Sequence, residues 1–572
     1  MLAGKYYGAY GADVKAFALE FQTGNDNGRS NPISIAELFS ENQSDANLIA
    51  DDVLPENLDI LNLSFGYNGN IERYTEEQLR TSYDKAIAAL AQGEKGEGKT
   101  ILVWAAGNAG NSSPDVLAGL PARINELQGH SVAVVSVGED GAIASDSNRC
   151  GIAGDFCIAA PGEQVLVAAV DSAEAPYRLD GGTSLATAIV SGGLAVMKQL
   201  FRDQLPNEAL LDRLLATAND DGLYNDPSIY GHGLMDLGTA TNPWGVLEFK
   251  EIGQQTTSGA GVPVTATALV PGSPLGDAFS RALAGQEAAA FDTLGAPFYF
   301  DAGIFTGVVP GATVAARLQD FLSEGGSPIP HTPQTWQFQF QEEGLFNQYG
   351  HMALADGASQ LSVAGPEGST LSLAHEPGRV QGLEVFWAAE ETPLSFGLGY
   401  ISEHDALLGS KSSGTFGEFS ADTVFVGARL SRTAGPWTVA ASGELGKALP
   451  NLGGSGWITD ASSLSTSAFR LAARRNFDNG SRLGFSVSQP LRVDGGAISF
   501  TPPTAIKGGR VQGRTTRLAL QSSGRQVDMT TTLEVPLAKG ELSFRMTRSS
   551  QPSHQRDAAP QWFFFTGYGA TW

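Results

Sequence analysis

Hydrophobic and polar residues alternate with two different periods along this chain of 572 residues. In the first part, short apolar runs at 58–63, 100–105 and 131–137 predict buried strands. Longer stretches with helical spacing at 75–92, 184–200 and 206–217 predict helices, and two further elements are predicted at 13–19 and 34–50. Strands that alternate with helices indicate a parallel, doubly wound α/β sheet.

From residue 333 to 572 the period changes to strict alternation of apolar residues with Gly, Ser or charged residues, as at 394–400, 437–445, 483–488 and 542–547. Roughly a dozen strands of about 8–11 residues fit this region, which is typical of an outer-membrane β-barrel. A soluble antiparallel sandwich, whose strands alternate equally well, is the alternative. The fold expected is therefore an α/β domain at 1–245 followed by an all-β domain at 333–572.

Residues 246–332 are rich in Gly, Ala and Pro and contain one predicted helix over 277–291. We expect a connector between the two domains. It either assists folding or is a plain linker with one packed helix.

Charge and cysteine content limit the partners and the cellular compartment that are expected for the protein. The net charge is −25, and residues 331–572 hold 19 Lys and Arg against 20 Asp and Glu, so no basic surface is expected to bind nucleic acid. Cys150 and Cys157 are the only cysteines and lie in one short loop, which predicts a disulfide and an oxidising compartment. Metal binding is the alternative, but no nearby His or third Cys supports it. No apolar run reaches the roughly 18 residues of a transmembrane helix, and no secretory signal follows Met1.

The stretch that carries chemistry is Gly181-Gly182-Thr183-Ser184, which opens onto a predicted helix. Free N–H groups and the helix dipole at such an N-terminus favour a developing oxyanion beside Ser184. An ordinary serine N-cap is the alternative. Three other stretches accompany it in order: Asn-Leu-Ser-Phe-Gly at 62–66, Trp-Ala-Ala-Gly-Asn-Ala-Gly-Asn at 104–111 and Ala-Ala-Pro-Gly at 159–162.

Together these motifs resemble the subtilisin-like serine proteases (subtilases), over roughly residues 1–245. The resemblance implies that Ser184 is the nucleophile and that the Asn108 side chain, with the Ser184 backbone N–H, stabilises the oxyanion. Ala188 stands where the family usually has proline, a change that leaves the chemistry intact. The resemblance also implies two backbone segments that flank the substrate, Ser64, Phe65 and Gly66 on one side and Ala105, Ala106 and Gly107 on the other.

The base and its orienting acid are not found among the motifs. In subtilases the order is Asp, His, Ser. None of the seven histidines stands in a His-Gly-Thr context, and only His130, which leads into a predicted strand, precedes Ser184. The residues after Met1 resemble those that follow the catalytic His helix of the family. We therefore expect this sequence to be N-terminally truncated, with the catalytic Asp and His upstream of Met1, and we expect the chain to be inactive alone.

The cysteine pair before Ala-Ala-Pro-Gly and the segment 276–301 resemble proteobacterial autotransporter serine proteases. This resemblance implies a secreted or surface-displayed endopeptidase that acts on polypeptides and is held in the bacterial outer membrane by its C-terminal domain. No cofactor or metal is expected, and a structural calcium ion is left open. The alternative is a non-catalytic envelope protein with a degenerate subtilase domain.

Overall fold

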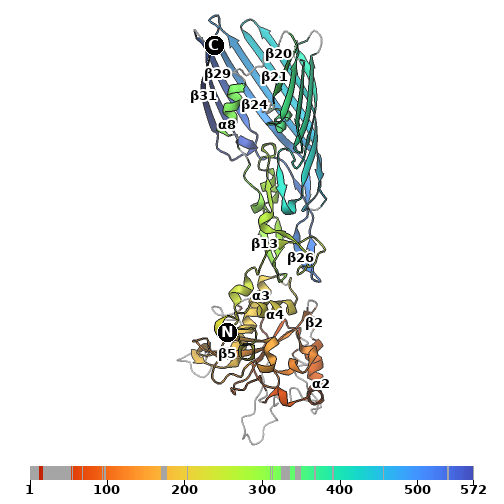
Figure 1. Cartoon of the computed structure of the whole chain (residues 1–572), viewed down its shortest axis with the longest axis vertical. Coiled ribbons are helices and arrows are strands. Elements are labelled where there is room, and N and C mark those ends of the chain that lie inside the picture. The colour runs from red at the N-terminus through yellow and green to blue at the C-terminus, as the bar shows by residue number, and fades with distance from the viewer. Residues whose placement is uncertain are drawn as a thin grey trace.

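The computed structural model describes residues 9, 12–16, 53, 56–66, 69–92, 94–95, 98–168, 177–202, 204–309, 311, 313–323, 335–341, 349–365, 369–388, 392–454, 456–537 and 540–570. These residues form three tiers along the long axis of the molecule: an α/β tier, a slender middle tier and a curved β-sheet (Figure 1). The predicted element at 34–50 and residues 17–19 of that at 13–19 lie outside the described residues, whereas residues 13–16 are exposed and form no strand, so the predicted strand is wrong there.

The α/β tier is built on a four-stranded parallel sheet. Its strands, in spatial order, are β1 (Ile60–Leu63), β4 (Ile101–Ala105), β5 (Ser131–Val137) and β6 (Cys157–Pro161). The helices are α2 (Glu76–Gln92), α3 (Thr183–Leu200) and α4 (Asn207–Ala216). The three predicted strands and three predicted helices in this region are confirmed. The strand β6 was not predicted, because a run of four small or apolar residues gives little periodicity.

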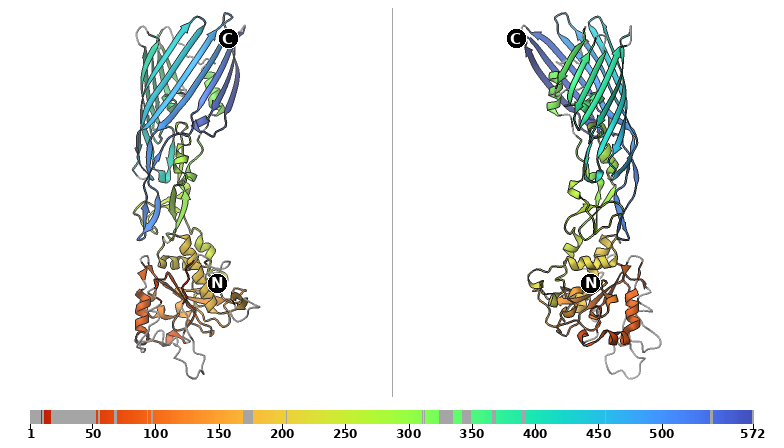
Figure 2. Two further views of the ribbon diagram at one scale, coloured as in Figure 1. Left: turned by 180° about the vertical axis from the view of Figure 1, so that it is seen from behind. Right: turned by 45° about the vertical axis from the view of Figure 1, so that its right-hand side comes forward.

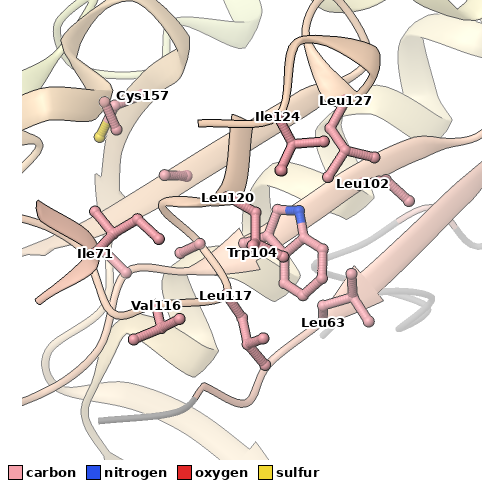
Figure 3. Packing of buried hydrophobic residues seen from close by; sticks show 14 of the residues in the cluster. Leu63, Ile71, Leu102, Trp104, Val116, Leu117, Leu120, Ile124, Leu127 and Cys157 are labelled. Atoms are coloured by element: carbon pink, nitrogen blue, oxygen red, sulfur yellow. The ribbon is translucent and has the colours of Figure 1, made fainter. Parts of the chain in front are cut away.

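Both faces of this sheet are buried, as a doubly wound arrangement requires. On one face Leu102 and Trp104 pack against α2 and the segment 116–127, so that the Trp104 indole lies among leucine side chains (Figure 3). On the other face Ile101 and Val103 pack against α3 and α4. Alternate residues of a single strand thus enter two separate cores, which explains the continuous apolar run in the sequence.

The middle tier has a small antiparallel sheet of its own. Its strands, in spatial order, are β10 (Val262–Pro263), β9 (Glu248–Phe249), β12 (Glu287–Phe291) and β13 (Pro297–Asp301). The helix α7 (Ala278–Leu283) is much shorter than the predicted helix at 277–291. That prediction is wrong beyond Leu283, because Gly285 turns the chain with a φ of +76° and residues 287–291 then pair with β13.

The hydrophobic core of the middle tier includes residues from the C-terminal region. Phe249 makes edge contacts with Trp457, and Phe279 stacks on Phe419, so its core is shared with the C-terminal region. The hairpin of β26 (Pro503–Lys507) and β27 (Arg510–Gly513) also descends along it, as Figure 2 shows from two sides. Where this hairpin reaches the α/β tier, the Ile506 N–H donates a hydrogen bond to Gln204 Oε1 at 2.6 Å.

The described residues of the C-terminal region form a twelve-stranded antiparallel sheet, in agreement with the roughly dozen strands predicted, and several short strands of the region lie outside it. In spatial order the strands of the sheet are β14 (Gln337–Gln341), β15 (Ser359–Ala364), β16 (Thr370–Glu376), β17 (Val380–Ala388), β18 (Leu394–Glu403), β20 (Phe419–Ala434), β21 (Trp437–Leu452), β23 (Leu464–Asn476), β24 (Arg482–Gly495), β29 (Val527–Leu537), β30 (Gly540–Ser550) and β31 (Gln561–Ala570). No helix of the described ranges is long and apolar enough to cross a membrane.

The two faces of this sheet are the reverse of those in a soluble protein. Leu398, Val426 and Leu445 lie side by side on β18, β20 and β21 and are 57%, 56% and 65% exposed. On the opposite face α8 (Val314–Ser323) is held by an ion pair of 2.6 Å between Arg317 and the buried Asp528. A sandwich would bury the apolar face, so that alternative does not fit this sheet.

Candidate active site

Ser184 lies at the start of α3, in the second residue of the helix. The helix follows Gly182, whose φ of +128° lets the chain turn sharply from Gly181 into the first turn. The Ser184 Oγ donates a hydrogen bond to the carbonyl oxygen of Ser64 at 3.0 Å, and the Ser64 Oγ donates to the Ser184 carbonyl oxygen at 2.9 Å. The serine is half-buried.

The Asn108 side chain is held in one orientation by Thr183. Its Oδ1 accepts hydrogen bonds from both the N–H and the Oγ1 of Thr183, each at 2.9 Å. The Thr183 Oγ1 in turn accepts from the Gly107 N–H at 3.2 Å. With its oxygen engaged in this way, the Asn108 amide presents its Nδ2 donor beside Gly182, where a Cβ atom would approach that nitrogen to 3.2 Å.

The two segments expected to flank a substrate lie at the same edge of the sheet. Ser64, Phe65 and Gly66 follow β1, whereas Ala105, Ala106 and Gly107 lie at the end of β4 and just beyond it. Since β1 and β4 are parallel neighbours, both segments leave the sheet at its carboxyl edge. The structure therefore brings Ser184, Asn108 and both segments together.

A buried carboxylate beneath this site was not recognised in the sequence. Asp115 is 6% exposed, and its Oδ1 accepts a hydrogen bond from Asn148 Nδ2 at 2.9 Å. Burial raises the pKa of Asp115 to about 6, against the opposing effect of hydrogen bonds from Asn148 and the Gly69 backbone. Asp115 and Asn148 lie in loops rich in polar residues, and no spacing in the sequence marks them as partners.

His130 and His232, the histidines before and after Ser184 in the sequence, make their hydrogen bonds away from it. His130 directly precedes β5, as predicted, and its ring nitrogens face the carbonyl oxygens of Gln128 and Leu90. His232 faces the carbonyl oxygen of Asp155. Within the described ranges, no histidine is hydrogen-bonded to Ser184, and no group of three or more His, Cys, Asp or Glu side chains could hold a metal ion.

Cys150 and Cys157 form a disulfide at the start of β6. Both cysteines are fully buried. The bond ties the loop before β6 to the strand that leads toward Ala159 and Pro161, so it stabilises the segment next to the serine turn.

Comparison with known proteins agrees with this geometry. The model of the Subtilase family (peptidase S8) matches residues 9–233. Serotype-specific antigen 1 of Mannheimia haemolytica is 34% identical over 176 residues, which are 30% of this chain and 19% of that protein. The Neisserial autotransporter lipoprotein NalP of Neisseria meningitidis serogroup B is 30% identical over 156 residues, 25% of this chain and 14% of NalP.

The aligned segment thus spans less than a fifth of either curated relative. Among solved structures, that of the patellamide maturation protease PatA is 25% identical with a TM-score of 0.29, and the match covers 37% of this chain and 69% of that one. The sequence motifs, the parallel sheet and the family match all fall in the same part of the molecule. Residues 9–233 of this chain are therefore a subtilase-family domain, with homologues among autotransporter proteins.

Proposed function

We propose that this protein is a serine endopeptidase displayed at, or released from, the surface of a bacterial outer membrane. The observation that carries the proposal is the meeting of Ser184 at the N-terminus of α3 with the Asn108 amide, whose orientation Thr183 fixes. An ordinary N-capping serine has no need of such a donor beside it.

In the proposed reaction the Ser184 Oγ attacks the carbonyl carbon of a peptide bond while its proton passes to a histidine base. The carbonyl oxygen becomes an oxyanion that the Asn108 Nδ2 and the Ser184 N–H stabilise. The amine then leaves with the proton from the base, and water hydrolyses the acyl-enzyme on Ser184. The histidine and its orienting aspartate are supplied by polypeptide other than the described residues.

The proposed attachment to the outer membrane rests on the twelve-stranded sheet. Its apolar side chains are exposed and its polar side chains are covered, which is the arrangement of a β-barrel in lipid. In water an exposed apolar surface of this extent is unfavourable. We therefore propose that lipid covers the face that carries Leu398, Val426 and Leu445.

The test is labelling of the natural gene product, in its own membranes, with a fluorophosphonate that reacts only with an activated serine. We expect Ser184 to be labelled, a Ser184→Ala variant not to be labelled, and Asn108→Ala to lower kcat by about 10²–10³-fold. Absence of label on correctly folded protein contradicts the proposal.

The alternative is a non-catalytic envelope protein, and one observation favours it. The Ser184 hydroxyl is engaged by the Ser64 carbonyl oxygen rather than by an imidazole of the described residues. If the labelling experiment fails while the Asn108 and Ser184 variants remain folded and in the membrane, a binding role is the function left.

A further inference from the structure

Three loops, which follow β1, β4 and β5, meet beneath the candidate site, and two buried side chains join them. Asn148, which is fully buried, accepts hydrogen bonds through its Oδ1 from the N–H groups of Ala109 and Asn111 at 3.2 and 2.9 Å. Its Nδ2 donates to the Ala106 carbonyl oxygen at 2.8 Å and to Asp115 Oδ1 at 2.9 Å. A single amide therefore holds the chain on both sides of Asn108.

Asp115 extends this network to the opposite side of the site. Its carboxylate accepts a hydrogen bond from the Gly69 backbone N–H, just after the segment 64–66. Its own N–H donates to the Ala106 carbonyl oxygen at 2.8 Å. Asp115 is thus bonded through its carboxylate to Gly69, just beyond the segment 64–66, and through its backbone N–H to Ala106 of the other segment.

Close packing at two glycines fixes the carboxylate under those segments. A Cβ atom on Gly107 would lie 2.3 Å from Asp115 Oδ2 and 2.4 Å from Asn148 Nδ2, and the φ of Gly107 is +105°. A Cβ atom on Gly66 would lie 3.0 Å from the same Oδ2. Only glycine allows the backbone to approach the pair this closely.

We propose that Asp115 and Asn148 are positioning residues for the peptidase reaction, holding the Asn108 loop at a fixed distance from the segment 64–69 before substrate binds. This inference rests on the proposed function of Ser184 and Asn108. The pair touches neither the scissile bond nor the nucleophile. It acts through the backbone on both sides of the oxyanion donor, where a small displacement weakens transition-state binding.

The other charged groups on these loops either make other hydrogen bonds or are exposed to solvent. Glu72 accepts a hydrogen bond from Ser113, Arg149 donates to the Gly110 carbonyl oxygen, and the Asp146 side chain is exposed. Asp115 is therefore held by neutral donors. Protonation turns one carboxylate oxygen into a hydroxyl and removes the charge that strengthens both hydrogen bonds, so the network is strongest with the carboxylate ionised.

The experiment compares three variants with the unaltered natural gene product. They are Asp115→Asn, the exchange variant Asp115→Asn with Asn148→Asp, and Asp146→Asn as a matched control on an exposed carboxylate of the same loops. We expect Asp115→Asn to lower kcat at least tenfold with KM changed less than twofold, because an amide keeps only one of the two acceptor oxygens. The exchange variant should recover part of that loss, and the control should match the unaltered protein.

The pH dependence separates positioning from a merely structural role. Dividing the kcat profile of the unaltered protein by that of Asp115→Asn cancels the titration of the histidine base. The ratio should fall toward one below about pH 6, where Asp115 becomes protonated. A flat ratio, or kcat values equal to those of the unaltered protein in both Asp115 variants, overturns the proposal.

Hydrogen exchange gives a readout that needs no activity. We expect the amides of Ala109, Asn111 and Gly69 to exchange at least tenfold faster in Asp115→Asn and to be protected again in the exchange variant. Unchanged protection overturns the proposal even if Ser184 proves unreactive. Absence of fluorophosphonate labelling with altered exchange would instead refute the peptidase function and leave the network intact.

Discussion

At the residue scale, the orientation of the Asn108 amide depends in part on the Thr183 hydroxyl. The Thr183 Oγ1 donates to Asn108 Oδ1 and accepts from the Gly107 N–H, so it couples the first turn of α3 to the loop after β4. Without that hydroxyl, only the Thr183 N–H holds Asn108 Oδ1, so the orientation of the amide is less firmly fixed.

We predict that Thr183→Val lowers kcat up to about tenfold with little change in KM, because Asn108 loses one of its two hydrogen bonds from Thr183, worth roughly 0.5–1.5 kcal/mol, and the Gly107 N–H loses its acceptor. The matched control is Thr187→Val, since the buried Thr187 hydroxyl donates to the Thr183 carbonyl oxygen of the same helix. Steady-state kinetics on a peptide substrate measures both. Equal kcat in the two variants would show that Thr183 has no special role.

The raised pKa of Asp115 also leads to a prediction about the stability of the α/β domain. Its pKa is raised from 3.8 to about 6 in the folded domain, so the folded state binds a proton more tightly than the unfolded state does. The contribution of this group to stability therefore falls as pH rises from about 4 to 6, by at most about 3 kcal/mol for a shift of roughly two pKa units. Hydrogen exchange in residues 131–137 should follow this trend in the unaltered protein and lose it in Asp115→Asn.

The sequence indicated some of these residues and not others. Ser184 and Asn108 stand in short motifs beside predicted strands and helices, so both residues and their meeting point could be predicted. Thr183, Asp115 and Asn148 act through hydrogen bonds between loops that are 33 to 75 residues apart in the chain. No local pattern encodes such a pairing, and a polar residue in a loop looks the same whether it is buried or not.

At the element scale, the spacing of apolar side chains along the sequence determined which helices and strands could be predicted. Strands β4 and β5 are apolar on both faces and were predicted within one residue of their observed bounds. The apolar run that follows α7 was assigned to the helix, because Ala288, Ala289 and Ala290 favour helices intrinsically. Pairing with β13 overrides that preference, which shows how tertiary contacts decide the state of a short alanine run.

The exposed apolar face of β20 leads to a prediction about the assembly of the sheet. Val426 is flanked on neighbouring strands by Leu398 and Leu445, so it lies within the apolar surface rather than at its edge. We predict that Val426→Arg costs about 2–4 kcal/mol in the membrane and lowers the fraction of assembled protein, measured by heat-modifiable migration on a gel.

The control for that variant is Val246→Arg in the middle tier, where the side chain is 58% exposed against 56% for Val426. In lipid only the substitution on the sheet should impair assembly. If both variants assemble equally well, the face of β20 is not covered by membrane.

At the scale of the whole molecule, one buried ion pair joins the subtilase domain to the middle tier. Arg213 of α4 and Asp292, which follows β12, are 1% and 0% exposed and lie 2.6 Å apart. Asp292 also accepts a hydrogen bond from the Trp244 N–H at 2.9 Å, and Arg213 donates to the Ala240 carbonyl oxygen. The two tiers are thus connected by a polar core, not only by the chain.

We predict that Arg213→Leu destabilises this junction by about 3–5 kcal/mol, since it leaves the Asp292 carboxylate buried without its cation. Arg202→Leu is the control at the same junction. Its partner Glu287 and Arg202 itself are 57% and 52% exposed, so that variant should cost no more than about 1 kcal/mol. Hydrogen exchange in residues 207–216 and 287–301 measures both, and equal effects would contradict the prediction.

The shared core of the middle tier imposes an order on folding. Phe249 and Phe279 pack against residues such as Phe419, Trp457 and Phe500, and the contact between Gln204 and Ile506 closes a loop of 302 residues. During synthesis, the tier that adjoins the peptidase cannot finish folding until the hairpin near residue 506 has emerged. The junction next to the proposed peptidase is therefore completed only after the sheet that is proposed to anchor it has been synthesised.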